Sequence, residues 1–336
     1  MSYAIGILDQ SPVIGNETNE EALQYSIELA QTAELLGYKR FWVAEHHNME
    51  QVAGVSPEIL IAHLLAKTKT IHIGSGGVML QHYSPYKVAE NFHLLANLAP
   101  NRVNVGIGKA PGGLRLSTKA LQFGTVNDGR DFEQRIKLLK DFLHNEVPES
   151  HALHGVQATP LPKEKLELFL LGGSENSAKL ATELDAHYVF ARFLNNSDEE
   201  LQKIATWHAN ENKHSGRKWI VAVAVLAAET DEEAEELAKD TKLYEITFAD
   251  GKTLSVQSEK QVEALKQQTN EAFTVSEKQV AVIAGTAVTI KEKLDQLHKT
   301  YGIDEFIFHT PLQERQARIA SFQRLGEIYW KERVTL

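Results

Sequence analysis

The chain has 336 residues and a formal net charge of −10 at pH 7, from 35 basic and 45 acidic side chains. This balance argues against a general nucleic-acid binder, which would present a basic face, and against binding to an anionic membrane. The chain contains no cysteine, which excludes disulfides, thiolate metal sites and a cysteine nucleophile. The first apolar segment, residues 3–8, shows no signal-peptide pattern, so we expect a cytoplasmic protein.

Strand and helix patterns alternate along almost the whole chain. Helix starts are marked by the Thr18/Glu21 capping box and by the Ser84-Pro85 pair. The segments with strand character are residues 3–8, 39–45, 71–74, 103–107, 168–171, 187–193, 219–227 and 305–308. Eight strands that are each followed by a helix predict one α/β domain over residues 1–336, a (β/α)8 TIM barrel rather than an open doubly wound sheet. Residues 241–285, after the seventh strand, break the pattern and are expected to form an insertion.

The second strand ends in three ionisable residues, Glu45, His46 and His47. In parallel α/β proteins, functional groups gather where strands end. Because neighbours in a strand point to opposite faces, Glu45 and His47 share one side and His46 takes the other. A neutral imidazole here suits general acid–base chemistry. A purely structural role for the two histidines remains an alternative. A zinc or iron site is another, although adjacent histidines of a regular strand do not readily chelate one ion.

Glycines interrupt the third strand segment and follow the fourth. Gly74-Ser75-Gly76-Gly77 lies within an apolar run, where glycine weakens a strand unless a ligand or another backbone comes close. The run therefore fits either a flat group that lies on bare backbone or a β-bulge. The loop 106–113 is also glycine-rich, and its Lys109 is placed to reach a phosphate or a ring oxygen.

A further motif, residues 172–177, joins the fifth strand to a helix. Its exposed amides and serine hydroxyls at the positive end of the helix would form an anion site, unless Ser174 only caps the helix. Arg130, which follows a polar turn, would add a bidentate charge to the same anion or extend into solvent. An anion site, a flat platform and a histidine on one face of a barrel would together suit FMN.

These residues resemble bacterial luciferase-like flavin monooxygenases, most closely the short single-chain members of unknown substrate. The similarity begins with Phe41-Trp42-Val43-Ala44-Glu45-His46-His47 and runs in order along nearly the whole chain. The other segments that carry the resemblance are 62–65, 70–80, 84–85, 89–90, 101–102, 106–108, 171–174 and 302–306.

The resemblance implies an enzyme that takes reduced FMN from a separate flavin reductase and uses O2, through a C4a-peroxyflavin, to oxidise a small organic substrate. His46 would be catalytic, as an acid–base or peroxide-stabilising residue oriented by Glu45 or a backbone group. The backbone at Gly76-Gly77, expected to contain a cis peptide bond, would carry the isoalloxazine. The residues expected to meet the phosphate come from three loops: Lys109, Pro111, Arg130, Gly173, Ser174 and Ser177. A homodimer is expected from the family, and no bound metal is expected because the sequence shows no further clustered metal ligands.

Two positions depart from the family pattern. Lys109 stands where luciferase has an arginine, which replaces a bidentate fork by a point charge. Gly108 stands where luciferase has a reactive cysteine, which excludes thiol chemistry there. The insertion 241–285 is expected to act as a lid that keeps water from the flavin. Two alternatives remain: a deazaflavin-dependent hydride-transfer oxidoreductase, and a flavin-binding protein without catalytic activity.

Overall fold

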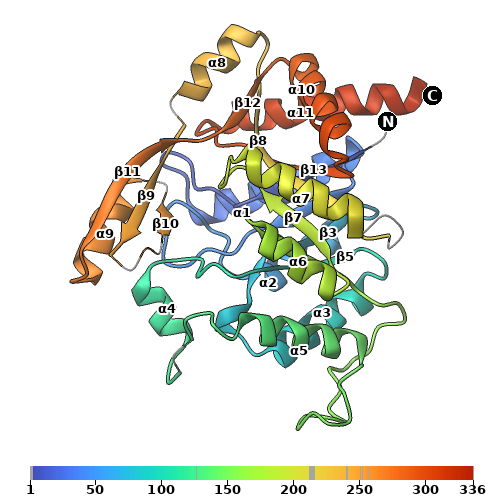
Figure 1. The fold of residues 1–336 in the computed structure, drawn as a ribbon. Coiled ribbons are helices and arrows are strands. Elements are labelled where there is room, and N and C mark those ends of the chain that lie inside the picture. Colours follow the sequence, from blue (N-terminus) through green and yellow to red (C-terminus); the bar gives the residue numbers. More distant parts are fainter. Residues whose placement is uncertain are drawn as a thin grey trace.

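The computed structural model describes residues 3–125, 127–211, 216–239, 241–249, 251, 253–256 and 258–335, with side chains up to residue 329. In this part of the chain, eight parallel strands close into a barrel, because β8 pairs with both β7 and β13 (Figure 1). The strands, in their order around the barrel, are β1 (Ala4–Asp9), β2 (Arg40–Val43), β3 (His72–Ser75), β5 (Val103–Gly108), β6 (Glu167–Gly172), β7 (His187–Ala191), β8 (Trp219–Ala227) and β13 (Glu305–His309). The predicted (β/α)8 fold is confirmed.

Helices pack against the outer face of this barrel. They are α1 (Asn19–Leu35), α2 (Pro57–Lys67), α3 (Pro85–Leu98), α5 (Phe132–His144), α6 (Glu175–Glu183), α7 (Asp198–Glu211), α8 (Asp231–Lys239), α10 (Ala287–Tyr301) and α11 (Arg315–Thr335). The capping box that starts α1 is formed, since Glu21 N donates to Thr18 Oγ1 (3.2 Å) and Thr18 N donates to Glu21 Oε2 (2.8 Å). No helix among the described residues is long and apolar enough to cross a bilayer.

Alternation along the strands sorts their side chains into two layers. On β2, Phe41 and Val43 belong to the large cluster between strands and helices, whereas Trp42 belongs to a second cluster inside the barrel. Other members of the inner cluster are Leu8, Ala44, Phe169, Val189, Ile220, Ala222 and Ile307. The register inside the barrel therefore follows the period of two that a strand imposes. Residues that continue the inner series past the strand ends reach the barrel mouth.

A buried ion pair closes the opposite, amino-terminal end of the barrel. Arg40 donates from Nε to Glu305 Oε1 (2.6 Å), from Nη2 to Oε2 (3.1 Å), and from Nη1 to Asn104 Oδ1 (2.8 Å). Both charged side chains are fully buried, and the guanidinium lies 4.8 Å from the ring centroid of Phe169. Such a pair must stay complete, because either charge alone would be desolvated without compensation.

The smaller elements lie in the loops at the carboxyl ends of the strands. They are β4 (Val78–Met79), a 3-10 turn (Leu80–His82), α4 (Arg115–Leu121), β9 (Lys242–Phe248), β10 (Thr253–Val256), α9 (Glu259–Gln268), β11 (Phe273–Gln279) and β12 (Val282–Gly285). Apart from residues 250, 252 and 257, which lie outside the described residues, the insertion 241–285 contains a three-stranded antiparallel sheet in the order β10-β9-β11. Figure 1 shows this sheet and α9 beside α4.

Candidate active site at the barrel mouth

Glu45 and His47 form a paired unit that is turned away from the barrel interior. Glu45 Oε1 accepts from His47 Nε2 (2.7 Å) and from the hydroxyl of Tyr83 (2.7 Å). Glu45 Oε2 accepts from Met79 N (2.9 Å), which ties the end of β2 to β4. The carboxylate is fully buried. Its role is structural, because its hydrogen bonds join two loops at the barrel mouth.

His46 lies on the opposite side, as the alternation along the strand predicts. It continues the inner series of Trp42 and Ala44, so its imidazole belongs to the mouth of the barrel. Its backbone N–H donates to Gly54 O (2.9 Å), and its Nδ1 is buried without a hydrogen-bond partner in the described part of the chain. Burial lowers the pKa of His46 to about 4, so the ring is neutral at physiological pH.

These contacts correct one expectation. Glu45 does not orient His46 by a hydrogen bond, because its carboxylate oxygens bond His47, Tyr83 and Met79 instead. They also disfavour the metal interpretation, since the side chains of His46 and His47 diverge. Across the described ranges, no group of three histidine, aspartate or glutamate side chains is arranged to hold a metal ion.

The glycine run at the end of β3 is explained first by backbone contacts. A Cβ on Gly77 would lie 2.8 Å from the carbonyl oxygen of Gly106, and one on Gly106 only 1.9 Å from that of Ser75. The Gly76–Gly77 peptide is cis, as the family resemblance implied. A Cβ on Gly76 would meet Leu8 and Trp42 of the inner cluster. The run therefore lies where the barrel interior reaches its mouth, and close packing accounts for its glycines, against backbone at Gly77 and against the Leu8 and Trp42 side chains at Gly76.

The residues of the predicted anion site at Ser174 and Ser177 lie where β6 leads into α6. Ser174 caps α6 by accepting from Ser177 N (3.4 Å), and the two serine hydroxyls are 3.2 Å apart. A Cβ on Gly173 would have only Asn195 nearby, at 3.7 Å, so no close contact forces glycine at this position. Ser174 therefore caps the helix, as one interpretation proposed, while both hydroxyls stay at the positive end of α6.

The other predicted phosphate contacts differ in availability. Lys109 follows β5, the neighbour of β6, and makes no ion pair with any described residue. Its Nζ lies 6.0 Å from the ring centroid of Phe132. The carbonyl of Pro111 accepts from His82 Nε2 (2.8 Å). Arg130 pairs with Asp128 (2.6 Å), and its side chain is 91% exposed, which is the solvated arrangement. Among the described residues, Lys109 therefore has no carboxylate partner and lies on the loop after the strand that pairs with β6, with its side chain near Gly129 and Phe132, whereas Arg130 would have to leave its carboxylate to bind an anion.

The sequence interpretation missed His309, the last residue of β13. It follows Ile307 by two positions, so it continues the inner series as His46 does on β2. Its ring packs at 5.3 Å from that of Phe193, and its Nδ1 is buried without a partner in the described part of the chain. Burial, with smaller contributions from Arg318 and His46, lowers the pKa of His309 to about 3. Strand alternation from Glu305 onward was the signal that would have identified it.

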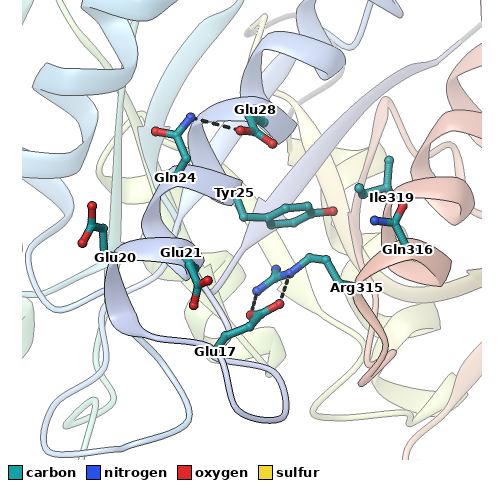
Figure 2. Close-up of a pocket in the computed structure, with 9 residues that line it drawn as sticks. All are labelled: Glu17, Glu20, Glu21, Gln24, Tyr25, Glu28, Arg315, Gln316 and Ile319. Carbon is teal, nitrogen blue, oxygen red and sulfur yellow. Dashed lines mark hydrogen bonds and ion pairs between the residues drawn. The ribbon is translucent and has the colours of Figure 1, made fainter.

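A surface cavity of about 410 Å³ between α1 and the start of α11 is a weaker candidate (Figure 2). Arg315, its cation, is already bound to Glu17 and lies 3.8 Å from the ring centroid of Tyr25. The other charged groups that line it are carboxylates, from Glu20, Glu21 and Glu28. Because Arg315 is already paired with Glu17 and the other charged groups are carboxylates, this cavity shows no complementary set of groups for a ligand. We therefore assign the site to the barrel mouth.

Comparison with known proteins identifies the family. Residues 4–305 match the family model of luciferase-like monooxygenases. The chain is 40% identical over 324 residues to N-acetyl-S-alkylcysteine monooxygenase of Bacillus subtilis (strain 168), covering 96% of this chain and 97% of that protein. The crystal structure of apo-MsnO8 superposes with a TM-score of 0.77 at 28% identity, covering 97% and 98% of the two chains.

A more distant structure shows the same fold. It is the oxygenating component of 3,6-diketocamphane monooxygenase from Pseudomonas putida in complex with FMN, with a TM-score of 0.67, 16% identity and 97% coverage of both chains. Together with the match over residues 4–305, these similarities extend over almost the whole chain. The chain belongs to the luciferase-like monooxygenase family.

Proposed function

We propose that the protein is an FMN-dependent monooxygenase that uses reduced FMN and O2 to oxidise a thioether, with an N-acylated S-alkyl amino acid as substrate. The observation that carries the proposal is a neutral, partly buried imidazole at the barrel mouth. The neighbouring loops offer two hydroxyls at a helix N-terminus after β6 and, after β5, a lysine that pairs with no described carboxylate. The substrate class is supported by the 40% identity to N-acetyl-S-alkylcysteine monooxygenase.

The residues of the rim fit a flavin phosphate. Ser174 and Ser177 offer hydroxyl donors at the amino-terminal end of α6, and Lys109 adds a positive charge from the next strand. The backbone around Gly76 and Gly77 lies where the barrel interior reaches its mouth. A flavin ring lying on this backbone would meet no side chain from either glycine.

The chemistry is divided between cofactor and protein. Reduced FMN supplies two electrons to O2, so that one oxygen atom enters the substrate and the other leaves as water. His46, neutral and turned inward, would donate or accept a proton at the reacting oxygen. The apolar lining above the inner cluster, including Leu171 and Phe193, would exclude water and receive the alkyl group of the substrate.

The cofactor and substrate are tested together by oxygen uptake. With chemically reduced FMN, addition of N-acetyl-S-methylcysteine is expected to produce one sulfur-containing product for each substrate consumed, without any reductase. Reduced deazaflavin should neither bind to the protein nor support turnover. Tight binding of the deazaflavin with anaerobic hydride transfer would instead favour the dehydrogenase alternative, and binding of FMN without any turnover would favour a flavin-binding protein.

We further propose that the insertion covers this mouth. Lys260 pairs with Glu50 on the loop that follows His46 and His47, while Arg115 at the start of α4 donates to Glu271 and lies 5.1 Å from the ring centroid of Phe248. An apolar cluster of Leu114, Ile246, Val256, Val262 and Leu265 joins the same parts. The insertion is thereby attached to the loops after β2 and β5, which both border the site.

Hydrogen exchange tests this covering role. Amides of β9 and α9 are expected to become at least several-fold better protected when reduced FMN and thioether are both present under anaerobic conditions. The surface helix α7 serves as an internal control and should not change. Unchanged hydrogen exchange in β9 and α9 would contradict the proposal that the insertion covers the mouth.

The supply of reduced FMN by a separate flavin reductase and the formation of a homodimer stay predictions.

A further inference from the structure

Lys109 and Arg130, two cations predicted to meet the phosphate, lie at opposite ends of the segment that joins β5 to α5. The two ends of this segment come together. A Cβ on Gly129 would lie 3.4 Å from Cε of Lys109, and Nζ of Lys109 is 6.0 Å from the ring centroid of Phe132. Lysine carries a point charge on a flexible stem, so its position at a ligand depends on what holds this segment.

His82, the last residue of the 3-10 turn after β4, is hydrogen-bonded to two separate points of the segment. Its Nε2 lies 2.8 Å from the carbonyl oxygen of Pro111, and its Nδ1 lies 3.1 Å from Nε2 of Gln122. Burial lowers the pKa of His82 below its usual value, which keeps the ring neutral at physiological pH. Because a carbonyl oxygen only accepts, Nε2 carries the proton and Nδ1 accepts from Gln122.

Gln122 extends this connection to the far end of the segment. Its Oε1 accepts from Asn127 N (2.9 Å), and its Nε2 donates to the carbonyl oxygen of Asn127 (2.9 Å). The backbone of Asn127 thereby fixes which side of the amide is the donor, and that donor also faces His82. Asn127 Oδ1 in turn accepts from Gly129 N (2.8 Å). Gln122 is buried, so the loss of one of these bonds would leave a buried polar group unpaired.

We propose that His82 and Gln122 are positioning residues for the flavin phosphate: together they hold Pro111 and Asn127, near the two ends of the segment, and so place Lys109 for the anion. Neither side chain is assigned a contact with the anion itself. The inference deepens the proposed function and rests on it for the ligand of Lys109. The hydrogen bonds themselves belong to the ligand-free protein and can be measured there.

Hydrogen exchange of the ligand-free, full-length protein provides the first test. His82→Phe keeps an aromatic ring but removes both nitrogens, whereas His82→Gln retains a donor for Pro111 and an acceptor for Gln122. The amides of Asn127 and Gly129 should exchange at least several-fold faster in His82→Phe than in the wild type, and His82→Gln should restore most of their protection. Amides of α7 should not change. Unaltered exchange of both amides in His82→Phe would overturn the proposal.

Binding of two flavins that differ only in the phosphate provides the second test. Under anaerobic conditions, the wild type should bind reduced FMN more tightly than reduced riboflavin, and Lys109→Gln should lower this preference about 10-fold, as expected for one charge-assisted hydrogen bond. His82→Phe should lower it about 3-fold to 10-fold with the Kd for riboflavin unchanged, and His82→Gln should recover most of it. In the Lys109→Gln background, His82→Phe should have no further effect, because His82 acts through Lys109.

The outcomes separate the inference from the proposed function. A preference for FMN that stays at its wild-type value in His82→Phe, although the segment exchanges faster, would overturn the positioning role alone. A wild-type protein that binds both flavins equally would contradict the phosphate site of the proposed function itself. Should His82→Phe fail to fold, Gln122→Met removes the amide with a side chain of similar length, and the same two measurements decide with the same expected directions.

Discussion

Replacing His46 with alanine is expected to lower kcat for thioether oxidation by about 100-fold or more, while the Kd for reduced FMN changes by less than about threefold. The reason is the placement of the ring. It points inward just after β2, it is neutral because burial lowers its pKa to about 4, and its Nδ1 has no hydrogen-bond partner among the described residues. A positioned acid–base group typically contributes 10²–10⁴-fold to a rate, roughly the loss expected here. Steady-state and single-turnover kinetics at pH 7 would measure it.

A matched control separates chemistry from folding. His63 lies exposed on α2, so His63→Ala removes an imidazole without touching the mouth and should leave kcat unchanged. The thermal midpoint of His46→Ala should remain near that of the wild type, since removing the ring eliminates a polar group that has no partner. A kcat for His46→Ala within threefold of the wild-type value would exclude His46 from the proposed mechanism.

Replacing Glu305 with alanine is expected to lower the free energy of unfolding by about 3–5 kcal/mol. The substitution leaves the guanidinium of Arg40 in the closed end of the barrel with Asn104 as its remaining polar partner (2.8 Å). Arg40 is fully buried, so water cannot replace the lost carboxylate without opening the barrel. Urea unfolding followed by far-UV circular dichroism would give the change directly.

Two comparisons sharpen that experiment. The exposed pair Lys203–Glu199 (2.7 Å) on α7 offers a control, because Glu199→Ala should cost less than 1 kcal/mol. The double variant Arg40→Met/Glu305→Leu removes both charges and should recover much of the loss, since a buried pair can often be exchanged for apolar side chains. A loss below 1 kcal/mol for Glu305→Ala would show that the barrel end is hydrated and that the pair is not essential.

The sequence predicted the barrel, and the position of His46 on the opposite face from Glu45 and His47, because both depend on short-range periodicity. Which of the two faces points inward came from the structure. Strand alternation separated His46 from Glu45 and His47, and the structure confirms that separation. The same alternation applied to residues 305–309 would have shown His309, but a lone histidine after an apolar run carries no signal by itself. Either Glu45 or a backbone group was expected to orient His46, and only the three-dimensional contacts of Glu45 with Tyr83 and Met79 reveal its other role.

The insertion was less predictable, for a physical reason. Strand β11 is exposed along nearly all its length and has no strong apolar alternation, so its pairing with β9 comes from the antiparallel ladder and not from burial. Helix α4, between β5 and α5, was not predicted because it spans only seven residues and has no side-chain cap. Helix α11 begins at Arg315, a few residues after Thr310. There, Thr310 provides a carbonyl acceptor for Arg318.

The glycine run shows how two explanations can share one stretch of sequence. Close approach of the Gly77 and Gly106 backbones is enough to require glycine, so the run alone does not identify a flavin platform. The proposal of a flavin depends instead on the rim formed by Ser174, Ser177 and Lys109, together with the family match over residues 4–305.

The most direct test of the account is isotopic. The wild-type protein would be mixed with reduced FMN and N-acetyl-S-methylcysteine under 18O2, and the products would be analysed by mass spectrometry. The account predicts a product that contains one 18O atom from O2, and none when the label is supplied only as H2 18O. A product without 18O from O2, or the same product formed without oxygen, would contradict it.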